Sequence, residues 1–307
     1  MTVTEVTQII GADGTVYDLE SGVGPKWVMT QEGWGMPSIN YLTTRDPQGG
    51  AESVVDYRLP PRFITMLLRQ GFCSREEYWA GRSALLDAIR FNQGPTGNSV
   101  PVTLRRRLSD GNLRDLEVYI LSGPGFTPQA STQWDQWGFT EQVRFVAYNP
   151  VITDPAQITT SVTLAGLSNL VFPITFPIVF GSATIDDTQN IVYAGTWLEY
   201  PLITITGPFN SPIITNTTTG EVIALSYEVP AGRTVTVDLS YGVKSVVDDQ
   251  GRNLIGVLTP ASAMETWHLA PDPEAPGGVN QIRVQGTDAQ PGVTDISILH
   301  HSRYIGI

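Results

Sequence analysis

A strand that ends in two proline dipeptides near mid-chain is the feature that most constrains the fold of this sequence. The segment VRFVAYNPVITDP, residues 143–155, begins with side chains that alternate between two faces, as they do in a strand. Asn149-Pro150 and Asp154-Pro155 follow within a few residues. Proline donates no backbone hydrogen bond and disfavours helix for the residue before it. The segment therefore predicts an exposed connection, which is either a simple loop or a domain boundary.

The distribution of charge favours a domain boundary. Residues 1–150 hold 13 basic and 16 acidic side chains, a net charge of −3, whereas the rest of the chain holds 5 and 14, a net charge of −9. A chain of 307 residues is also long enough for two hydrophobic cores. We expect two separately folding domains, residues 1–151 and residues 152–307.

Cysteine content and hydropathy narrow the class of protein. The one cysteine, Cys73, cannot form an internal disulfide. The start, MTVTEVTQII, has no basic stretch followed by an apolar run, so we expect no secretory signal and assembly in a cytoplasm. The most apolar run, LVFPITFPIVF at residues 170–180, has eleven residues and two prolines. A spanning helix needs roughly 20 residues, so we expect no membrane insertion.

Net charge bears on nucleic-acid binding. The chain carries −12, whereas surfaces that bind phosphate are built from clustered Lys and Arg. The run Arg105-Arg106-Arg107 does not form one patch on a strand, because Arg106 faces away from its neighbours. We expect no sequence-specific binding of nucleic acid, and we interpret the run as a solvated strand or as inter-subunit ion pairs.

The first half predicts one helix among strands. Ser74 and Glu77 have the spacing of a capping box, and apolar residues follow at helical intervals, which predicts a helix over residues 75–91. Asp110-Gly111-Asn112 predicts the turn of a hairpin, because these residues tolerate positive φ. Trp134 and Trp137 are expected to pack in a loop or an interface. The predicted strands are residues 53–59, 63–69, 100–108, 113–121 and 139–148.

The second half lacks a convincing helical period. Short strands with turns between them are typical of a β-sandwich or barrel. We place Asp186-Asp187, Thr219-Gly220 and Asp248-Asp249 in turns, where their side chains or flexible backbone are useful. That placement gives the acidic pairs no catalytic role.

A search for reactive groups finds none. Gly166-Leu167-Ser168-Asn169 lacks the second glycine of a nucleophile elbow, and the sequence contains no HExxH, CxxC or P-loop. His300 and His301 are neighbours on a predicted strand and point to opposite faces, and His268 stands apart, so no metal site is indicated. We therefore expect no enzyme activity and no cofactor, and a structural or binding role.

Several segments resemble the distal tail proteins of long-tailed bacteriophages. FVAYNP at residues 145–150 is similar to the strand end that closes the family's ring domain. In the second half, GTWLEYPLITITGP (195–208), PIITNTTTGEVI (212–223) and WHLAPDPEAPGGVNQIRV (267–284) are similar in layout to its peripheral domain. The loop at residues 271–280 is longer than the usual Pro-Gly-x-Asn turn.

The resemblance implies a mainly β fold, with a β-rich ring domain carrying one helix at residues 1–151 and a galectin-like β-sandwich at residues 152–307. It implies a virion protein at the tail tip, a homo-hexameric ring that joins the tail tube to the hub or fibres and continues the DNA channel. Its implied partners are the tail tube protein, the hub or tape measure, and tail fibre or receptor-binding proteins. We also expect that residues 1–151 alone assemble into the ring.

A different class of function stays open. Acidic sandwich domains that carry aromatic residues also serve as carbohydrate-binding modules for recognition of host surfaces. Trp197, Tyr200 and Trp267 are the candidate stacking residues on that hypothesis. Core packing of the same side chains is the alternative, because sandwich cores also use tryptophan.

Overall fold

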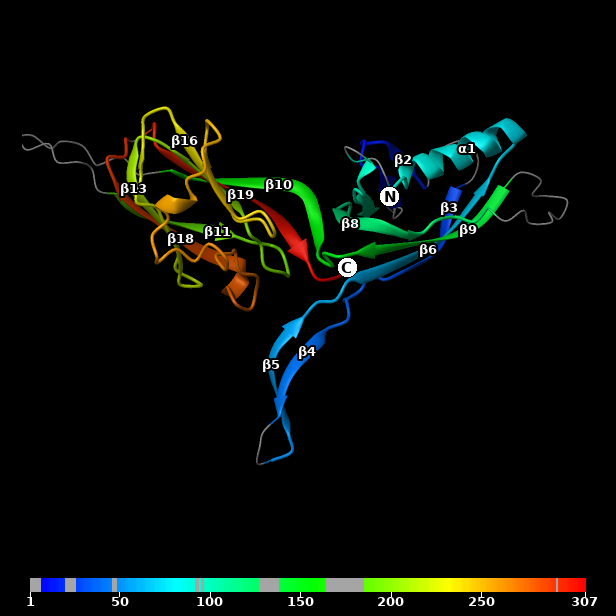
Figure 1. Cartoon of the computed structure of the whole chain (residues 1–307), viewed down its shortest axis with the longest axis horizontal. Helices are drawn as coiled ribbons and strands as arrows, with labels where there is room; N and C mark the ends of the chain where they lie inside the picture. The colour runs from blue at the N-terminus through cyan, green and yellow to red at the C-terminus, as the bar shows by residue number, and fades with distance from the viewer. Residues whose placement is uncertain are drawn as a thin grey trace, which may run out of the picture. The chain divides into compact units, whose positions relative to one another are not determined.

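The computed structural model describes residues 7–19, 26–45, 49–91, 94, 97–126, 138–163, 185–290 and 292–307. The chain divides into two compact units (Figure 1). Unit 1 comprises Met1–Pro155 and Tyr304–Ile307, and unit 2 comprises Ala156–Arg303. The predicted boundary between residues 151 and 152 therefore falls inside unit 1. The predictions for Trp134, Trp137, residues 166–169 and residues 170–180 lie outside the described residues.

Unit 1 is built from antiparallel strands around one core. Its strands are β1 (Thr7–Ile10), β2 (Val16–Asp18), β3 (Lys26–Glu32), β4 (Asn40–Arg45), β5 (Glu52–Arg58), β6 (Arg62–Gly71), β7 (Val102–Arg107), β8 (Leu113–Ser122), β9 (Gly138–Ala147) and the first part of β10 (Ile152–Thr163). One path of pairing runs β10-β8-β7-β1-β2 and another runs β3-β6-β9-β8. Because β8 belongs to both paths, the sheet can bend around the core residues between them.

The helix of unit 1 and the hairpin of β7 and β8 form as the sequence predicts, although the helix ends three residues earlier than predicted. Helix α1 spans Arg75–Ala88, and the Glu77 amide donates to Ser74 Oγ at 3.2 Å. The Glu77 carboxylate accepts from the Cys73 amide, so the cap reaches one residue further back than a standard capping box. Strands β7 and β8 pair through a turn in which Gly111 has a φ of 90°. Leu85, Ala88 and Ile89 place α1 on the unit 1 core.

Unit 2 is a two-layered β-structure, as expected. Its strands are the second part of β10, β11 (Ile185–Val192), β12 (Leu202–Thr206), β13 (Phe209–Asn216), β14 (Glu221–Ala224), β15 (Glu228–Val229), β16 (Thr234–Asp238), β17 (Ser245–Asp248), β18 (Val279–Thr287) and β19 (Asp295–Tyr304). One sheet runs β17-β16-β12-β19-β10 and the other β11-β18-β13-β14, with β15 on β13. The described part of unit 2 contains no α-helix. Besides strands, it has two short 3-10 helices, η2 (Ile255–Val257) and η3 (Pro276–Gly278).

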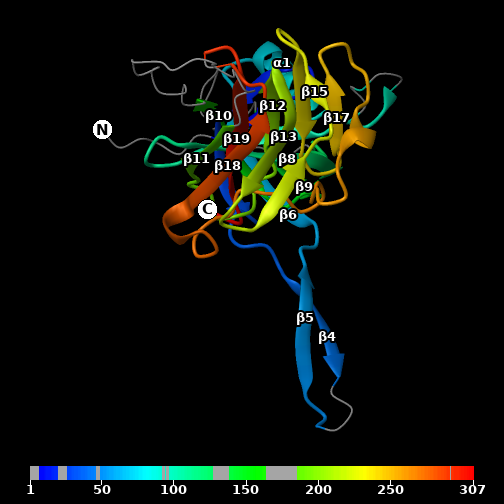
Figure 2. The ribbon, with the colours of Figure 1, turned by 90° about the vertical axis from the view of Figure 1, so that its left-hand side faces the viewer.

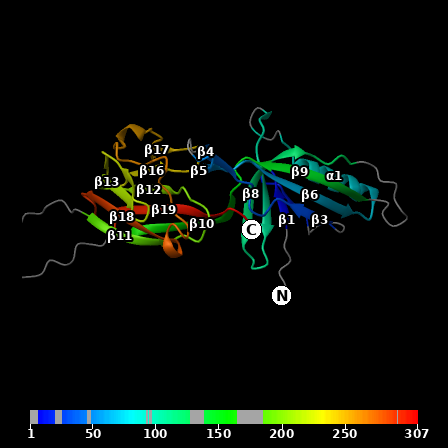
Figure 3. The same cartoon turned by 90° about the horizontal axis from the view of Figure 1, so that it is seen from below.

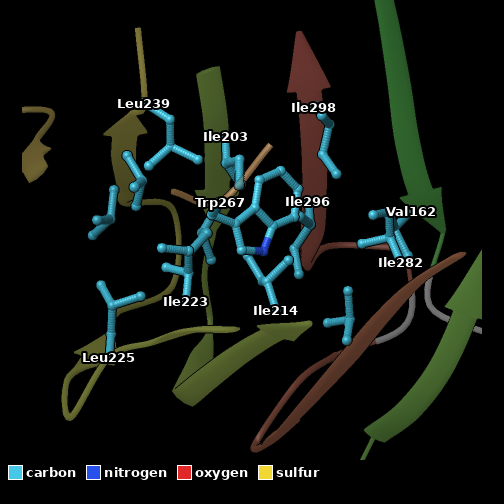
Figure 4. Packing of buried hydrophobic residues seen from close by; sticks show 14 of the residues in the cluster. Val162, Ile203, Ile214, Ile223, Leu225, Leu239, Trp267, Ile282, Ile296 and Ile298 are labelled. Atoms are coloured by element: carbon cyan, nitrogen blue, oxygen red, sulfur yellow. The ribbon is translucent and has the colours of Figure 1, made fainter. Parts of the chain in front are cut away.

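The core of unit 2 lies between its two sheets. Trp267 is fully buried at its centre, among Ile203 and Ile298 of one sheet and Ile214 and Ile282 of the other (Figure 4). Burial of a ring this large removes some of the greatest apolar area that a side chain can offer. Unit 2 therefore has a hydrophobic core of its own, separate from the core of unit 1.

The prediction that Asp154-Pro155 closes an exposed connection is wrong. Strand β10 runs through both residues, and the chain passes from unit 1 to unit 2 within this strand. Strand β10 pairs with β8 at Thr153 and Asp115, before Pro155. The missing amide proton of this proline therefore removes no hydrogen bond from that ladder. The Asp154 carboxylate accepts from Arg114 at 3.0 Å. Figure 3 shows β10 beside β19, its neighbour in unit 2.

The three predicted turns of the second half have different outcomes. Asp186 and Asp187 lie inside strand β11, so their assignment to a turn is wrong. Cross-strand pairing explains the error, because Arg283 on β18 donates to both Asp186 carboxylate oxygens at 2.6 and 2.5 Å. Thr219-Gly220 does join β13 to β14. Asp248 does begin a turn after β17, where its carboxylate accepts from the backbone of Gln250 and Arg252.

Candidate assembly surface

The hairpin of β4 and β5 is an apolar surface of unit 1 that no other described strand covers. Each strand pairs with the other and with no third strand among the described residues (Figure 2). Every residue of both strands is exposed. Tyr41, Leu42, Val54, Val55 and Tyr57 are all between 48% and 67% exposed. An isolated two-stranded hairpin is marginal in water, so its exposed apolar side chains make this hairpin a candidate contact surface.

The two faces of this hairpin differ in chemistry. Residues that pair across an antiparallel ladder point to the same side. Tyr41 pairs with Tyr57 and Thr43 with Val54, which gives one face two tyrosines and a valine, and the pair Arg45 with Glu52 follows on the same face. The other face carries the pairs Leu42 with Asp56 and Thr44 with Ser53, interrupted at a bulge. We call the side of Tyr41, Tyr57, Thr43 and Val54 the aromatic face.

Arg62 holds the base of the hairpin in place. This base consists of residues 33–39, which precede β4, and residues 59–62, which follow β5. The Arg62 guanidinium is 3% exposed and donates from Nη1 to the carbonyls of Gly33 and Gly35 at 2.8 and 2.5 Å. Nε donates to the Pro150 carbonyl at 2.9 Å. Burial lowers the pKa of Arg62 to about 10.

The last four residues of the chain lie against the same base, and we call Tyr304–Ile307 the C-terminal strap. The Ile305 carbonyl accepts from Arg62 Nη2 at 2.6 Å, and the Ile307 amide donates to the Trp34 carbonyl at 3.2 Å. Gly306 lies so close that a Cβ there would be 2.9 Å from backbone atoms of Gly35 and Met36. The strap is therefore packed backbone to backbone on the segment that leads into the hairpin.

The run of three arginines is partly accounted for within one chain. Arg105 makes two hydrogen bonds to Asp115, its direct partner on β8, at 2.7 and 2.6 Å. The Arg106 guanidinium lies 5.9 Å from the centre of the Trp34 ring. Arg105 therefore forms its ion pair within one chain, and the inter-subunit ion pairs expected for the run stay a prediction.

The three candidate stacking residues do not form one platform. Trp267 has no exposed surface, so its ring offers no face to a sugar, and its assignment as a stacking residue is wrong. Lys244 Nζ lies 4.1 Å from the centre of the Tyr200 ring and occupies one of its faces. Trp197 is half-buried. A role for Tyr200 or Trp197 in binding carbohydrate stays a prediction.

The acidic pairs and the histidines are engaged in structural contacts. Hydrogen bonds from Arg283 hold the pKa of Asp186 below its usual value, and bonds from the Arg252 backbone and side chain do so for Asp248 despite its desolvation. His268 lies between Glu221 and Glu274, 3.2 Å from each. His300 and His301 do point to opposite faces, His300 being 1% exposed. Within the described ranges, no three potential ligand side chains gather as a metal site.

A buried polar group of unit 2 was not predicted from the sequence. Glu199 is 2% exposed and forms an ion pair with Arg303. The carboxylate and the guanidinium are close together, but they are not aligned for a hydrogen bond. Burial raises the pKa of Glu199, while Arg303 opposes the rise. Glu199 also accepts from the His301 amide at 3.0 Å. This group fixes the end of β19 just before the strap begins.

The sequence predicts only one of the two strands of the β4–β5 hairpin. It predicts β5 but not β4, because YLTTR is short and polar beside the core strands. The signal that was present is the Asp-Pro-Gln-Gly-Gly segment at residues 46–50, turn residues between two strand-like runs. No sequence pattern indicates that the strap returns to unit 1, since four residues carry too little information.

Comparison with known proteins finds solved structures with a similar fold. No family model matches the chain, and no curated protein matches it by sequence. The crystal structure of the SPP1 Dit (gp 19.1) protein, described as a paradigm of hub adsorption apparatus in phages infecting Gram-positive bacteria, superposes with a TM-score of 0.61. It is 13% identical and the match covers 98% of this chain and 99% of that one.

Two further structures, of the phage P2 baseplate in its activated conformation with Ca and with Sr, each match at 11% identity and cover 97% of this chain and 98% of theirs. Their TM-scores are 0.48 and 0.44. None of the helices in the described part is long and apolar enough to cross a membrane. The mainly β architecture, with one α-helix in its described residues, therefore has the fold of a phage distal tail protein.

Proposed function

We propose that this protein is a structural component of a phage tail tip, in which six copies close into a ring through unit 1. The ring would join the tail tube to the hub or fibres and continue the channel through which DNA leaves. The exposed apolar side chains of the hairpin of β4 and β5, which joins no third described strand, are the observation that carries this proposal. The fold shared with the SPP1 hub protein supports it at the level of architecture.

Ring closure requires each subunit to offer two different, complementary surfaces. The aromatic face supplies one of them. Tyrosine is favoured at protein interfaces, because its ring buries apolar area while its hydroxyl keeps a polar partner. The hairpin of one subunit would pack this face on the body of the next subunit, and six repetitions would close the ring.

The charge of the chain is compatible with a channel for DNA. A net charge of −12 over the whole chain leaves little basic surface to retain phosphates. Unit 2, with its own core, would stay outside the ring and meet the fibre or receptor-binding protein. No catalytic role is proposed, since the acidic residues of the predicted turns are held by arginines and backbone amides.

A pair of variants on one hairpin tests this proposal. Tyr57→Lys puts a charge on the aromatic face, and Thr44→Lys puts the same charge on the opposite face of the adjacent strand. Both residues are exposed, so neither change disturbs the core. Tyr57→Lys should abolish the ring and leave folded monomers, whereas Thr44→Lys should keep it, as measured by light scattering after gel filtration. Equal ring formation by both variants contradicts docking through the aromatic face.

A further inference from the structure

The C-terminal strap joins the end of the chain to the beginning of the hairpin. Residues 304–307 belong to unit 1, although the preceding 148 residues, Ala156–Arg303, form unit 2. Three contacts hold the strap: the Arg62 bond to the Ile305 carbonyl, the Ile307 bond to the Trp34 carbonyl, and the close approach of Gly306 to Gly35 and Met36. All three lie within the base of the hairpin.

The strap also has a side-chain anchor. The Arg114 guanidinium lies 3.9 Å from the centre of the Tyr304 ring, and Arg114 is itself paired with Asp154 on β10. A cation at this distance is attracted by the negative face of the ring. The strap is thus fixed on one side to β8 and β10 and on the other to the entry of β4.

Arg62 connects the strap to the other segments of the hairpin base. It is buried and donates to four backbone carbonyls, those of Gly33, Gly35, Pro150 and Ile305. A buried guanidinium that loses an acceptor is left with an unsatisfied donor, which is costly. Because one of these acceptors belongs to the strap, the full set exists only when the chain's last residues have folded back.

We propose that the C-terminal strap fixes the direction in which the hairpin leaves unit 1, so that a subunit can enter the ring only after its last residues are in place. Since the strap follows unit 2 in the chain, ring assembly waits for unit 2 to be made and folded, which runs against the expectation from the sequence that residues 1–151 alone assemble into the ring. The assembly part of this inference rests on the proposed function. The mechanical part, the fixing of the hairpin, stands on the contacts themselves.

Distance measurements between spin labels test the mechanical part in the full chain. Cysteines are placed at Thr44 on the hairpin and at Ser83 on the exposed side of α1, with Cys73→Ser as background, and labelled protein is diluted with unlabelled protein. In the reference protein the distance distribution should be narrow. In Gly306→Ala it should be about twice as broad, because the added methyl displaces the strap from Gly35 and frees the hairpin.

Gly35→Ala is the matched control, because a Cβ there meets no atom within 4 Å. It should keep the narrow distribution. An unchanged distribution in Gly306→Ala overturns the inference, as does equal broadening in both variants. Arg62→Lys, which keeps the charge but cannot reach four carbonyls, gives an independent second disturbance and should broaden the distribution as well.

Ring formation is measured on the same proteins by light scattering. Loss of the ring in Gly306→Ala together with broadening supports the whole inference, and broadening with an intact ring overturns its assembly part. If the reference protein forms no ring at all, the proposed function fails, and the distance distributions still decide whether the strap fixes the hairpin.

Discussion

The guanidinium of Arg62 donates a 2.6 Å hydrogen bond to the carbonyl of Ile305, a residue 243 positions later in the chain. This bond, together with those to Gly33, Gly35 and Pro150, makes one side chain the centre of the hairpin base. The hairpin that we propose to build the ring is therefore held at its base by three separate segments of unit 1, around residues 33–35, 150 and 305. Its stability depends on a residue that offers no obvious signal in the sequence.

Arg62→Met should destabilise unit 1 much more than an exposed arginine would. The change removes the buried donor that four backbone carbonyls share, so we expect the free energy of unfolding of unit 1 to fall by about 2–4 kcal/mol. Arg58→Met, on the exposed end of β5, is the control and should cost little. Calorimetry of the full chain, with the transitions of the two units separated, gives the comparison. Equal losses in the two variants would show that Arg62 is not a centre of stability.

Asn280 should be similarly important in unit 2. Its buried amide donates to the carbonyls of Ala270 and Gly278 and accepts from the Ala270 amide and the Asn216 side chain. Asn280→Ala removes all four bonds, and we expect a loss of about 2–4 kcal/mol in the unfolding of unit 2. Gln250→Ala, in the exposed turn after β17, should be close to neutral. A loss below about 1 kcal/mol for Asn280→Ala would contradict this role.

Unit 2 should lose stability in mild acid because of His300. Burial, and the neighbouring His301, lower the pKa of His300 below its usual 6.5, and neither ring nitrogen has a hydrogen-bond partner. The unfolded chain then binds a proton more readily than the folded one, so the contribution of neutral His300 is present above pH 6.5 and is lost as pH falls through that value. Tyr193 contacts the ring, and Glu199 and Arg303 lie at the same end of β19.

Glu199 acts in the opposite sense. Its pKa is raised in the folded state, so its contribution is lost as pH rises above its usual 4.5. The fall in stability between roughly pH 7 and pH 5.5 should therefore shrink in His300→Leu and persist in His301→Gln, when unfolding of unit 2 is followed at each pH. The same pH dependence in His300→Leu as in the parent protein would assign the effect to other groups.

The sequence predicts those elements whose signals are local. The cap of Ser74, the turn at Asp110-Gly111-Asn112 and the strand at residues 113–121 need only neighbouring residues to be recognised. Asp186 was misplaced because its partner, Arg283, lies 97 positions away, and only strand pairing brings them together. The start of strand β10 was predicted as an exposed connection because of Pro155, although this proline falls where the ladder with β8 needs no donor.

The candidate assembly surface was also predictable only in part, because the contacts that support it are not local in the sequence. A hairpin that stands apart from the core has no buried face, so its side chains are not forced into a clear alternation of apolar and polar residues. Its base depends on contacts between segments from three distant parts of the chain. Trp267 shows the converse case, since a tryptophan in a loop looks available for a ligand until the fold buries it.

The central claim is that six copies of this chain close into a ring. Native mass spectrometry of the full-length protein tests it most directly, measured over a range of micromolar concentrations and again in isolated tail particles. The account predicts a species of six times the chain mass of 33.4 kDa, or twice that number of chains if two rings stack face to face. A monomer at every concentration, with no ring in the particles, would contradict it.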